Sequence, residues 1–291
     1  MTSTTTPVHI GMPSEQAFLQ EALRALPLYI QHCECPDHWH ALWVGLKATG
    51  MMRGLHGQAD FLATMLRPHV VRSGHVMIAG AADTAALDVL HAALGDDGTR
   101  YTVVDRCQAP LLLLRQRALE LGVELDTVHT GIEDARTERP WTLAFIHYTL
   151  AFMDAASRQR LIRHLRQDIA ADGVVVCAVR EKQAQALDEP ARQTATSVQT
   201  IEGKLSTTFT AHEALIAPLR QWLPGYVGGL QQREGQMVGF EQVMAEFQAG
   251  GFSILQSHCN PGQVLTHASY VSPRAGITNW VALLAPDPAW S

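Results

Sequence analysis

The sequence lacks any apolar run near the roughly 18 residues that a membrane-spanning helix needs. It also lacks a basic stripe: 22 Lys and Arg residues stand against 28 Asp and Glu residues, for a formal charge of −6. This balance argues against nucleic acid as the main partner. The first residues, MTSTTTPVHIGMPS, have neither the basic nor the apolar region of a signal peptide. We therefore expect a cytoplasmic protein that binds neither a membrane nor nucleic acid.

Internal repeats and low-complexity tracts are missing too, which excludes the solenoid architectures. The cysteines are odd in number and some lie in strand-like runs, which favours reduced thiols in a cytoplasmic protein. They are Cys33, Cys35, Cys107, Cys177 and Cys259. With 291 residues, 47% of them hydrophobic and 17% charged, the chain has the composition of an ordinary globular protein with a substantial core.

Helical periodicity dominates the first quarter of the chain. After a polar lead-in, Ser14 is a plausible N-cap for the amphipathic run EQAFLQEALRALPLYIQHC, which Pro27 should kink or split. HWHALWVGLKATG predicts a second helix that ends at Gly50, and RGLHGQADFLATMLRP predicts a third that stops before Pro68. We therefore predict a helical cap over residues 1–70.

Short apolar strands alternate with helices in residues 71–291, which predicts an α/β domain with a mostly parallel sheet covered on both faces. The expected strands cover residues 76–79, 101–104, 124–129, 143–148 and 174–179. A polar, Gln- and Thr-rich stretch breaks this rhythm, and we expect residues 182–238 to form an inserted lid over the carboxyl edge of the sheet. Two late strands, SILQSHCN and NWVALLAP, follow a helix closed by Gly250-Gly251.

The stretch HVMIAGAADTAA carries the strongest functional signal. It predicts a buried strand over residues 76–79, a sharp turn over residues 80–83 and a helix that begins at Thr84. About 25 residues after the turn, the strand YTVVD ends in Asp105, as in a nucleotide-binding βαβ unit. Small residues let backbone N–H groups approach a polar ligand, and a carboxylate at the next strand end can accept both ribose hydroxyls.

This order of elements resembles the class I S-adenosylmethionine-dependent methyltransferases over roughly residues 70–290. The resemblance is carried by VMIAGAADTA, by the strand that ends in Asp105, by FIHYTLAF, by the strand after Asp172-Gly173 and by the AGGF step into the late strands. It implies a Rossmann-like sheet of seven strands, mostly parallel, with one late antiparallel strand. It also implies S-adenosylmethionine as the cofactor.

The resemblance further implies that the first turn holds the methionine part of the cofactor, that the acid after the second strand binds ribose, and that residues after the third strand frame adenine. The cofactor-binding residues expected on this basis are Gly80, Ala81, Ala82, Asp83, Asp105, Arg106, Cys107, Ile132 and Glu133. Arg53 is a further candidate, because a guanidinium suits the cofactor carboxylate, but it could equally lie on a solvated helix face. Asp83 could instead cap the helix, and Cys107 could be a buried filler rather than a wall against adenine.

The chain departs from the family pattern at several positions. Ala82 and Thr84 stand where the family has two further glycines, and Ile78 replaces an acid within the first strand. Gly131 occupies the place of the acid usual after the third strand, which leaves Glu133 or Asp134 as substitutes. The first turn should therefore differ in shape, or be held by Asp83 as a helix cap.

His147 and Tyr148 follow the fourth strand, where the transferred group would lie, and are the predicted catalytic residues. His147 could take a proton from a nucleophile, and Tyr148 could place its ring against a sulfonium cation. Alternatively, one of the two points into the packing. His56 and Gln58 are unusually polar for residues just before the sheet.

The segment CECPDHWH raises the question of a metal site through Cys33, Cys35, His38 and His40. The spacing is too tight for the usual zinc arrangement, in which a loop or helix separates the ligand pairs. We therefore predict a helix–helix corner with Trp39 and Trp43, four residues apart, in the core, and no metal.

The favoured function is methyl transfer to the O or N of a small molecule, by in-line displacement at the sulfonium methyl. A second hypothesis keeps S-adenosylmethionine but has its own amino group attack its γ-carbon, which forms azetidine-2-carboxylate and expels methylthioadenosine. A third is a non-catalytic binding protein. The acceptor remains open, and the chain could act alone or as a homodimer.

Overall fold

The computed structural model describes residues 10–52, 54–69, 73–95, 98–182, 191–234, 238–259 and 277–290. Arg53, which we expected to bind the cofactor, lies outside these residues, as do residues 260–276 between the last two strands. No helix in the described part of the chain combines the length and the apolar character that a bilayer crossing demands.

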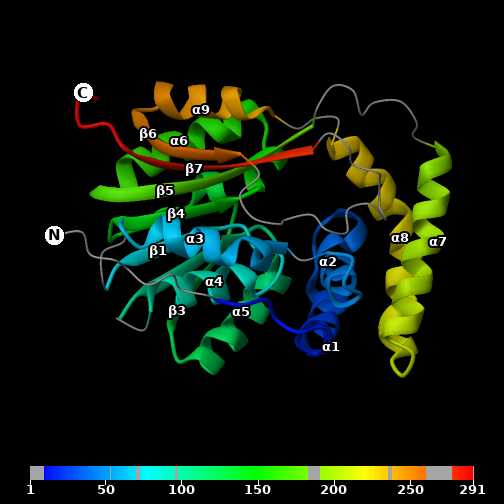
Figure 1. The fold of residues 1–291 in the computed structure, drawn as a ribbon. Coiled ribbons are helices and arrows are strands. Elements are labelled where there is room, and N and C mark those ends of the chain that lie inside the picture. The colour runs from blue at the N-terminus through cyan, green and yellow to red at the C-terminus, as the bar shows by residue number, and fades with distance from the viewer. Residues whose placement is uncertain are drawn as a thin grey trace.

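A seven-stranded sheet runs through the molecule in the order β3-β2-β1-β4-β5-β7-β6 (Figure 1). Its strands are β1 (His75–Ala79), β2 (Arg100–Asp105), β3 (Glu124–His129), β4 (Trp141–His147), β5 (Ile169–Lys182), β6 (Phe252–Cys259) and β7 (Ile277–Pro286). The first five strands pair in parallel, whereas β7 is antiparallel to both β5 and β6. The predicted Rossmann-like sheet with one late antiparallel strand is confirmed.

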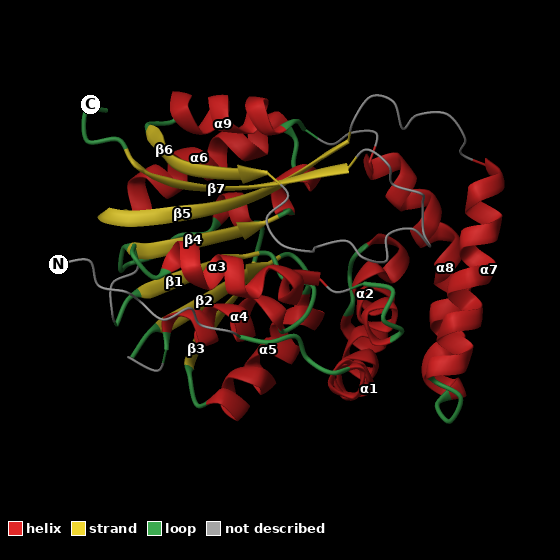
Figure 2. Ribbon diagram, in the orientation of Figure 1, coloured by secondary structure: helices red, strands yellow, loops and turns green. Residues whose placement is uncertain are grey.

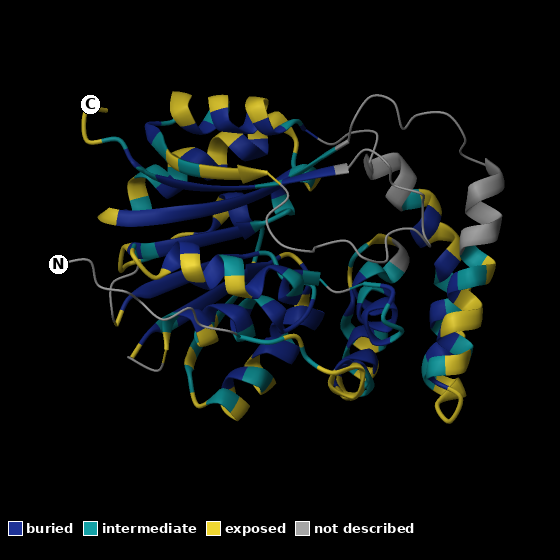
Figure 3. Ribbon diagram, viewed as in Figure 1, coloured by how far each residue is buried: buried dark blue, intermediate teal, exposed yellow. Residues whose placement is uncertain are grey.

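Helices cover both faces of the sheet, as the apolar strands require (Figure 2). One core lies under α6 (Ala155–Asp168) and α9 (Phe240–Ala249). The opposite core lies under α3 (Ala59–Leu66), α4 (Ala85–Leu94) and α5 (Gln108–Leu121). All five residues of β1 are buried, and the strands at the centre of the sheet are dark along their length in Figure 3.

A layer of helices stands beyond the carboxyl edge of the sheet (Figure 1). It consists of α1 (Glu15–His32), the short η1 (Pro36–His38), α2 (Trp39–Ala48), α7 (Ala191–Thr208) and α8 (Glu213–Glu234). The inserted helices α7 and α8 share an apolar core with α1 and α2, and this core reaches the first turns of α5. The insertion therefore packs on the N-terminal helices. The division of the chain into a cap and a lid-bearing domain stays a prediction.

Three local expectations change in the structure. Ser14 caps α1 as predicted, with Oγ accepting from the N–H of Ala17, but Pro27 does not split the helix. The packing of buried neighbours such as Leu26 outweighs the one hydrogen bond that proline removes. The expected third helix begins as the 3₁₀ turn η2 (Gly54–Gln58) before α3. Asp172-Gly173, expected to precede the fifth strand, lies inside β5, where the register with β4 shifts.

Three further short turns lie at the carboxyl edge of the sheet. They are η3 (Ile132–Asp134), which follows β3, and η4 (Thr149–Phe152), which follows β4, together with the Asp154 cap of α6. These turns, the turn after β1 and the loop after β2 all meet at the same edge, because the parallel strands all end there. The candidate site is built from them.

Candidate functional site

The turn after β1 needs glycine at its first position. Gly80 has φ +79°, in the left-handed region, and its N–H donates to the carbonyl oxygen of Val104 over 2.8 Å. A Cβ atom at this position would lie 2.8 Å from Oγ1 of Thr149. That hydroxyl in turn donates to the carbonyl oxygen of Ala79. Gly80 therefore combines a backbone conformation and a close approach that L side chains do not tolerate well.

Asp105 joins the turn after β1 to the loop after β2. Its Oδ2 accepts the N–H of Ala81 over 2.9 Å, and its Oδ1 accepts the N–H of Cys107 over 2.7 Å. The residue is only 9% exposed, and burial raises its pKa above the usual value despite the opposing charge of His40. Each oxygen has a further lone pair. The carboxylate can therefore accept two hydroxyl donors while it holds both loops.

A buried ion network holds the same turn to the N-terminal helices. The ammonium of Lys47 in α2 lies 2.8 Å from Oδ2 of Asp83 and 2.9 Å from Oε2 of Glu21 in α1. Trp43, one helical turn before Lys47, donates its indole N–H to the same Asp83 oxygen over 2.8 Å. The Lys47 side chain is 1% exposed. The network thus connects two N-terminal helices to the first turn of the sheet.

The charges of this network are mutually dependent. Burial opposes the carboxylate of Asp83, but Lys47 outweighs burial and lowers the pKa of Asp83 to about 2. Burial likewise opposes the charge of Lys47, yet Asp83 and Glu21 raise its pKa. For Glu21, burial is stronger than the attraction of Lys47, and the pKa is raised. We take Lys47 and Asp83 as the firmly charged pair at neutral pH.

Asp83 also caps the helix that follows the turn. Its Oδ1 accepts the N–H of Ala85 over 2.8 Å, and the residue is 5% exposed. Thr84 donates its hydroxyl to Glu21 over 3.0 Å, and Tyr29 donates its hydroxyl to the carbonyl oxygen of Ala82 over 2.9 Å. Of the two roles left open for Asp83, this geometry favours the helix cap.

The residues expected to frame adenine lie after β2 and β3. Arg106, whose side chain is 67% exposed, forms an ion pair with Glu133, whose side chain is 3% exposed. Ile132 is buried beside Glu133 in η3. A Cβ at Gly131 would lie 2.7 Å from Oε2 of Glu133, so the missing acid at position 131 leaves room for the Glu133 carboxylate. The Glu133 carboxylate therefore lies beside position 131, and its role toward adenine stays a prediction.

The carboxyl end of β4 carries an uncharged polar group. The Nε2 of His147 lies 3.0 Å from Oε1 of Gln58, and the amide nitrogen of Gln58 donates to the Tyr148 hydroxyl over 3.4 Å. Burial, with the nearby cation of Arg180 as a second cause, lowers the pKa of His147 to about 3. The Arg180 guanidinium lies 4.7 Å from the centre of the Tyr148 ring. One face of Tyr148 is thus already occupied by a cation.

Cys107 has different neighbours from those expected of an adenine wall. It is 3% exposed. Its side chain lies close to those of Cys33, Cys35 and His40, which belong to the N-terminal helical region. Hydrogen bonds from the Cys33 and Cys35 thiols lower the pKa of Cys107 well below the usual range. Burial opposes the charge of His40, but its hydrogen bonds to Cys107 and Cys33 raise its pKa to about 9.

The residues that hold the site from outside the sheet were not predicted from sequence patterns. Lys47 and Glu21 were not singled out, and Trp43 was expected only as core. One signal was present: Trp39, Trp43 and Lys47 are spaced four residues apart, so they place a lysine on the same helix face as two tryptophans. A lysine on an apolar face needs an acidic partner, but helix periodicity cannot say which one.

No protein-family model matches the sequence, and no curated protein matches it significantly. Among solved structures, a putative sarcosine dimethylglycine methyltransferase from Galdieria sulphuraria aligns with a TM-score of 0.52 at 9% identity, over 79% of this chain and 85% of that one. N-methyltransferase NodS from Bradyrhizobium japonicum WM9, in complex with S-adenosyl-L-homocysteine, aligns with a TM-score of 0.50 at 15% identity, over 92% and 98%.

The pyocyanin biosynthetic protein PhzM aligns with a TM-score of 0.49 at 16% identity, over 94% of this chain. This chain spans only 63% of the length of PhzM. The similarity to the first two structures, at such low identity, concerns the fold alone. The chain has the Rossmann-like fold of class I S-adenosylmethionine-dependent methyltransferases.

We expect Lys47→Met to lower the free energy of unfolding by about 3–5 kcal/mol, because it leaves two buried carboxylates without their cation. Urea unfolding measures this loss. Lys204→Met, at an exposed position of α7, is the matched control and should change the value by less than about 0.5 kcal/mol. Adding Glu21→Gln to Lys47→Met should recover part of the loss. A Lys47→Met protein as stable as the control would contradict the network.

We expect His147 to make the protein sensitive to mild acid. Its pKa of about 3 in the folded state lies below the value of about 6.5 in the unfolded chain, so only the unfolded state takes up a proton between these values. The stabilisation is complete above about pH 6.5 and is lost as the pH falls, by about 2 kcal/mol at pH 5. His147→Gln should make the decline between pH 7 and pH 5 shallower by that amount in urea titrations.

His212→Gln, at an exposed position, is the matched control for this comparison. Equal pH slopes for His147→Gln and the unmodified protein would show that His147 takes up its proton equally well in the folded state.

Proposed function

We propose that this protein binds S-adenosylmethionine at the carboxyl edge of the sheet and transfers its methyl group to the O or N of a small molecule. One observation carries the proposal: the buried Asp105 carboxylate, at the end of β2, accepts the N–H of Ala81 and so holds the turn after β1 beside the acid that ends β2. This is the position at which the fold class places the ribose-binding acid. The methyltransferase NodS, which has the same fold, holds S-adenosylhomocysteine.

The shape of the first turn supports this cofactor despite the missing glycines. Only Gly80 adopts a left-handed φ in the turn, and Thr84 has φ −79°. Ala82 and Thr84 therefore fit without strain where the family has glycine. The helix cap made by Asp83 and the Tyr29 hydroxyl on Ala82 hold the turn in place. Preset backbone groups lower the entropy that a ligand loses on binding.

His147, at the carboxyl end of β4, indicates which chemical class of acceptor the site could methylate. S-adenosylmethionine supplies an electrophilic methyl group on a sulfonium. With a pKa of about 3, His147 is neutral but a weak base, so it is poorly matched to remove a proton from an unreactive hydroxyl at neutral pH. We therefore favour an acceptor that is nucleophilic without help, such as a neutral amine or an already ionised oxygen. For such a group, alignment with the methyl is the main requirement.

The helices beyond the edge support a small acceptor. The layer of α1, α2, α7 and α8 stands over the carboxyl ends of the strands (Figure 1). Phe152, after β4, is 54% exposed, and its ring lies 6.4 Å from that of Trp39 in α2. These two rings offer an apolar surface between η4 and α2. A covering of this kind excludes water from the reacting atoms more easily for a small molecule than for a macromolecule.

The low basicity of His147 is also compatible with a second candidate reaction, the intramolecular cyclisation. There the amino group of the bound molecule attacks its own γ-carbon, the γ-carbon–sulfur bond breaks, and methylthioadenosine leaves with the electron pair of that bond. The new ring nitrogen then loses a proton to solvent. Uncharged groups such as His147, Tyr148 and Gln58 suit a neutral amine, and no separate acceptor is required.

We expect Asp105→Asn to weaken S-adenosylhomocysteine binding about 100-fold, because two charge-assisted hydrogen bonds to ribose become weaker. Isothermal titration calorimetry measures the dissociation constant. Asp126→Asn, at an exposed position of β3, is the matched control and should bind like the unmodified protein. Unchanged affinity in a folded Asp105→Asn protein would overturn the proposed cofactor site.

The product distribution separates the candidate reactions. Incubation with S-adenosylmethionine alone should leave it largely intact if an acceptor is required, and a panel of small amines and phenols should then release S-adenosylhomocysteine. Methylthioadenosine formed without any acceptor would establish the cyclisation instead. A protein that is not thermally stabilised by S-adenosylmethionine and forms neither product would be a non-catalytic one. Liquid chromatography with mass detection resolves both products.

A further inference from the structure

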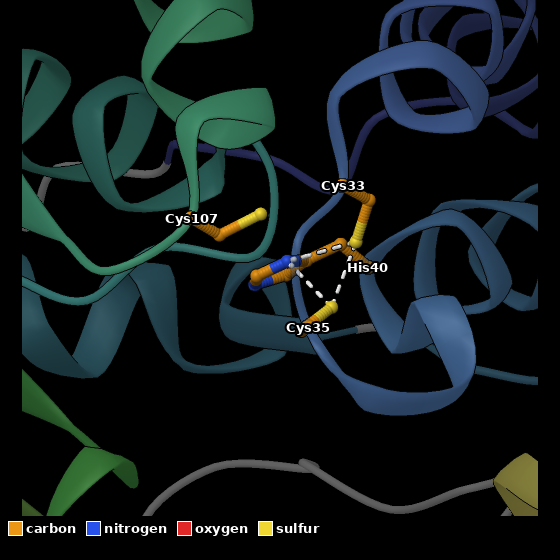
Figure 4. A group of neighbouring side chains, drawn as sticks. All are labelled: Cys33, Cys35, His40 and Cys107. Carbon is orange, nitrogen blue, oxygen red and sulfur yellow. Dashed lines mark hydrogen bonds between the residues drawn. The ribbon is translucent and has the colours of Figure 1, made fainter.

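Four side chains with metal-binding atoms converge beside the candidate site (Figure 4). The sulfur atoms of Cys33, Cys35 and Cys107 and one ring nitrogen of His40 all lie within 4.8 Å of one another. Cys33, His40 and Cys107 are buried, and Cys35 is half-buried. Figure 4 shows Cys107 approaching from the α5 side, opposite Cys33, Cys35 and His40, which come from the end of α1, the loop after it and the first turn of α2.

The distances suit a single tetrahedral ion. Nδ1 of His40 lies 3.4 Å from the sulfur of Cys35 and 3.7 Å from that of Cys33. Bond lengths of 2.3 Å to sulfur and 2.0–2.1 Å to nitrogen place these atoms about 3.5 Å apart around a tetrahedral zinc ion. The sulfurs of Cys33 and Cys35 are 2.7 Å apart and would separate by about 1 Å. Such a shift needs only side-chain rotation in a half-buried residue.

The local backbone explains why three ligands meet within eight residues. Cys33 ends α1, with its N–H bonded to the carbonyl oxygen of Tyr29. Cys35 precedes η1, and His38, with φ +46°, turns the chain into α2. His40 is therefore carried back toward the two cysteines in the first turn of α2. In the sequence this spacing was judged too tight for zinc, because no loop or helix separates the ligand pairs.

The fourth ligand comes from the sheet. Cys107 is the N-cap residue of α5, where the helix dipole favours a thiolate. The N–H of Glu34, between the two N-terminal cysteines, donates to the sulfur of Cys107 over 3.4 Å. Amide hydrogen bonds of this kind orient and stabilise thiolate ligands. His38, the other candidate in the sequence, instead stacks on Trp222 with ring centres 3.9 Å apart.

We propose that Cys33, Cys35, His40 and Cys107 bind one zinc ion, which fastens the N-terminal helices to the loop after β2. Three thiolates and an imidazole form a closed set that leaves no position open for substrate, so the site is structural. Soft sulfur donors exclude calcium and magnesium, which bind oxygen. The site revises the prediction of no metal that the spacing of CECPDHWH had suggested.

The zinc site would also support Asp105. The N–H of Cys107 donates to Oδ1 of Asp105, so an ion that holds Cys107 also holds this carboxylate in place. This consequence rests on the proposed function, because it concerns the ribose-binding role of Asp105. The metal site itself does not depend on it.

The first experiment measures zinc in the full-length protein. The chain is produced with zinc in the medium, dialysed against a weak chelator, and analysed by inductively coupled plasma mass spectrometry. We expect one zinc ion per chain, and at least a tenfold loss of zinc in Cys107→Ser and in Cys35→Ser. Cys259→Ser, at an exposed position of β6, is the matched control and should keep its zinc. Full zinc in the Cys107→Ser protein would overturn the four-ligand site.

The second experiment uses the unmodified chain, so it does not depend on whether the variants fold. Zinc is removed with a strong chelator under reducing conditions, and cobalt is then added. We expect sulfur-to-cobalt charge-transfer bands and the intense visible bands of tetrahedral cobalt, which zinc abolishes. Returning zinc should raise the unfolding temperature by roughly 10 °C. Weak octahedral cobalt spectra, or a mass two hydrogens lower from a Cys33–Cys35 disulfide that zinc does not prevent, would overturn the proposal.

The third measurement compares S-adenosylhomocysteine affinity in the zinc-loaded and zinc-free protein by calorimetry. We expect weaker binding without zinc. Equal affinity would overturn the supporting role for Asp105. Binding in neither form would count against the proposed function and would leave the cobalt and zinc results to decide the metal site on their own.

Discussion

The ammonium of Lys47, buried between Glu21 and Asp83, is the interaction on which the rest of the site depends. A charge removed from water is tolerated only when partners surround it, so α1 and α2 must take the one position that brings both carboxylates to it. Asp83 lies in the turn after β1. The N-terminal helices are therefore part of the cofactor side of the sheet, and the turn keeps its shape without the glycines usual in the family.

Asp105 connects the turn that Lys47 holds to the loop after β2. Its two oxygens accept N–H groups from the turn after β1 and from Cys107 after β2. The first loop is held to the N-terminal helices by Lys47, and the second meets the same helices at the cysteines and histidine drawn in Figure 4. One carboxylate thus joins two loops that are each anchored from outside the sheet. The two loops are thereby held in place before any ligand arrives, which lowers the entropic cost of binding.

Sequence patterns predicted the sheet and the residues of its edge because those features are local. Alternation of apolar strands and helices requires a covered parallel sheet, and Gly80 and Asp105 are recognisable from their places after consecutive strands. The pairing partners were not predictable. Gln58 and His147 are 89 residues apart, and Cys107 lies 67 residues after His40 in the printed sequence. Spacing within one segment carries no information about such contacts.

The sequence by itself determined the fold class, the first turn and the acid after β2, since hydrophobic periodicity and chain reversal act over a few residues. The tertiary structure decided what surrounds them. It turned Asp83 inward to Lys47, placed Arg180 over the ring of Tyr148 and brought a fourth metal-binding side chain to CECPDHWH. The charge and the partners of these side chains depend on burial and on long-range packing. Burial and packing arise only when distant segments of the chain meet.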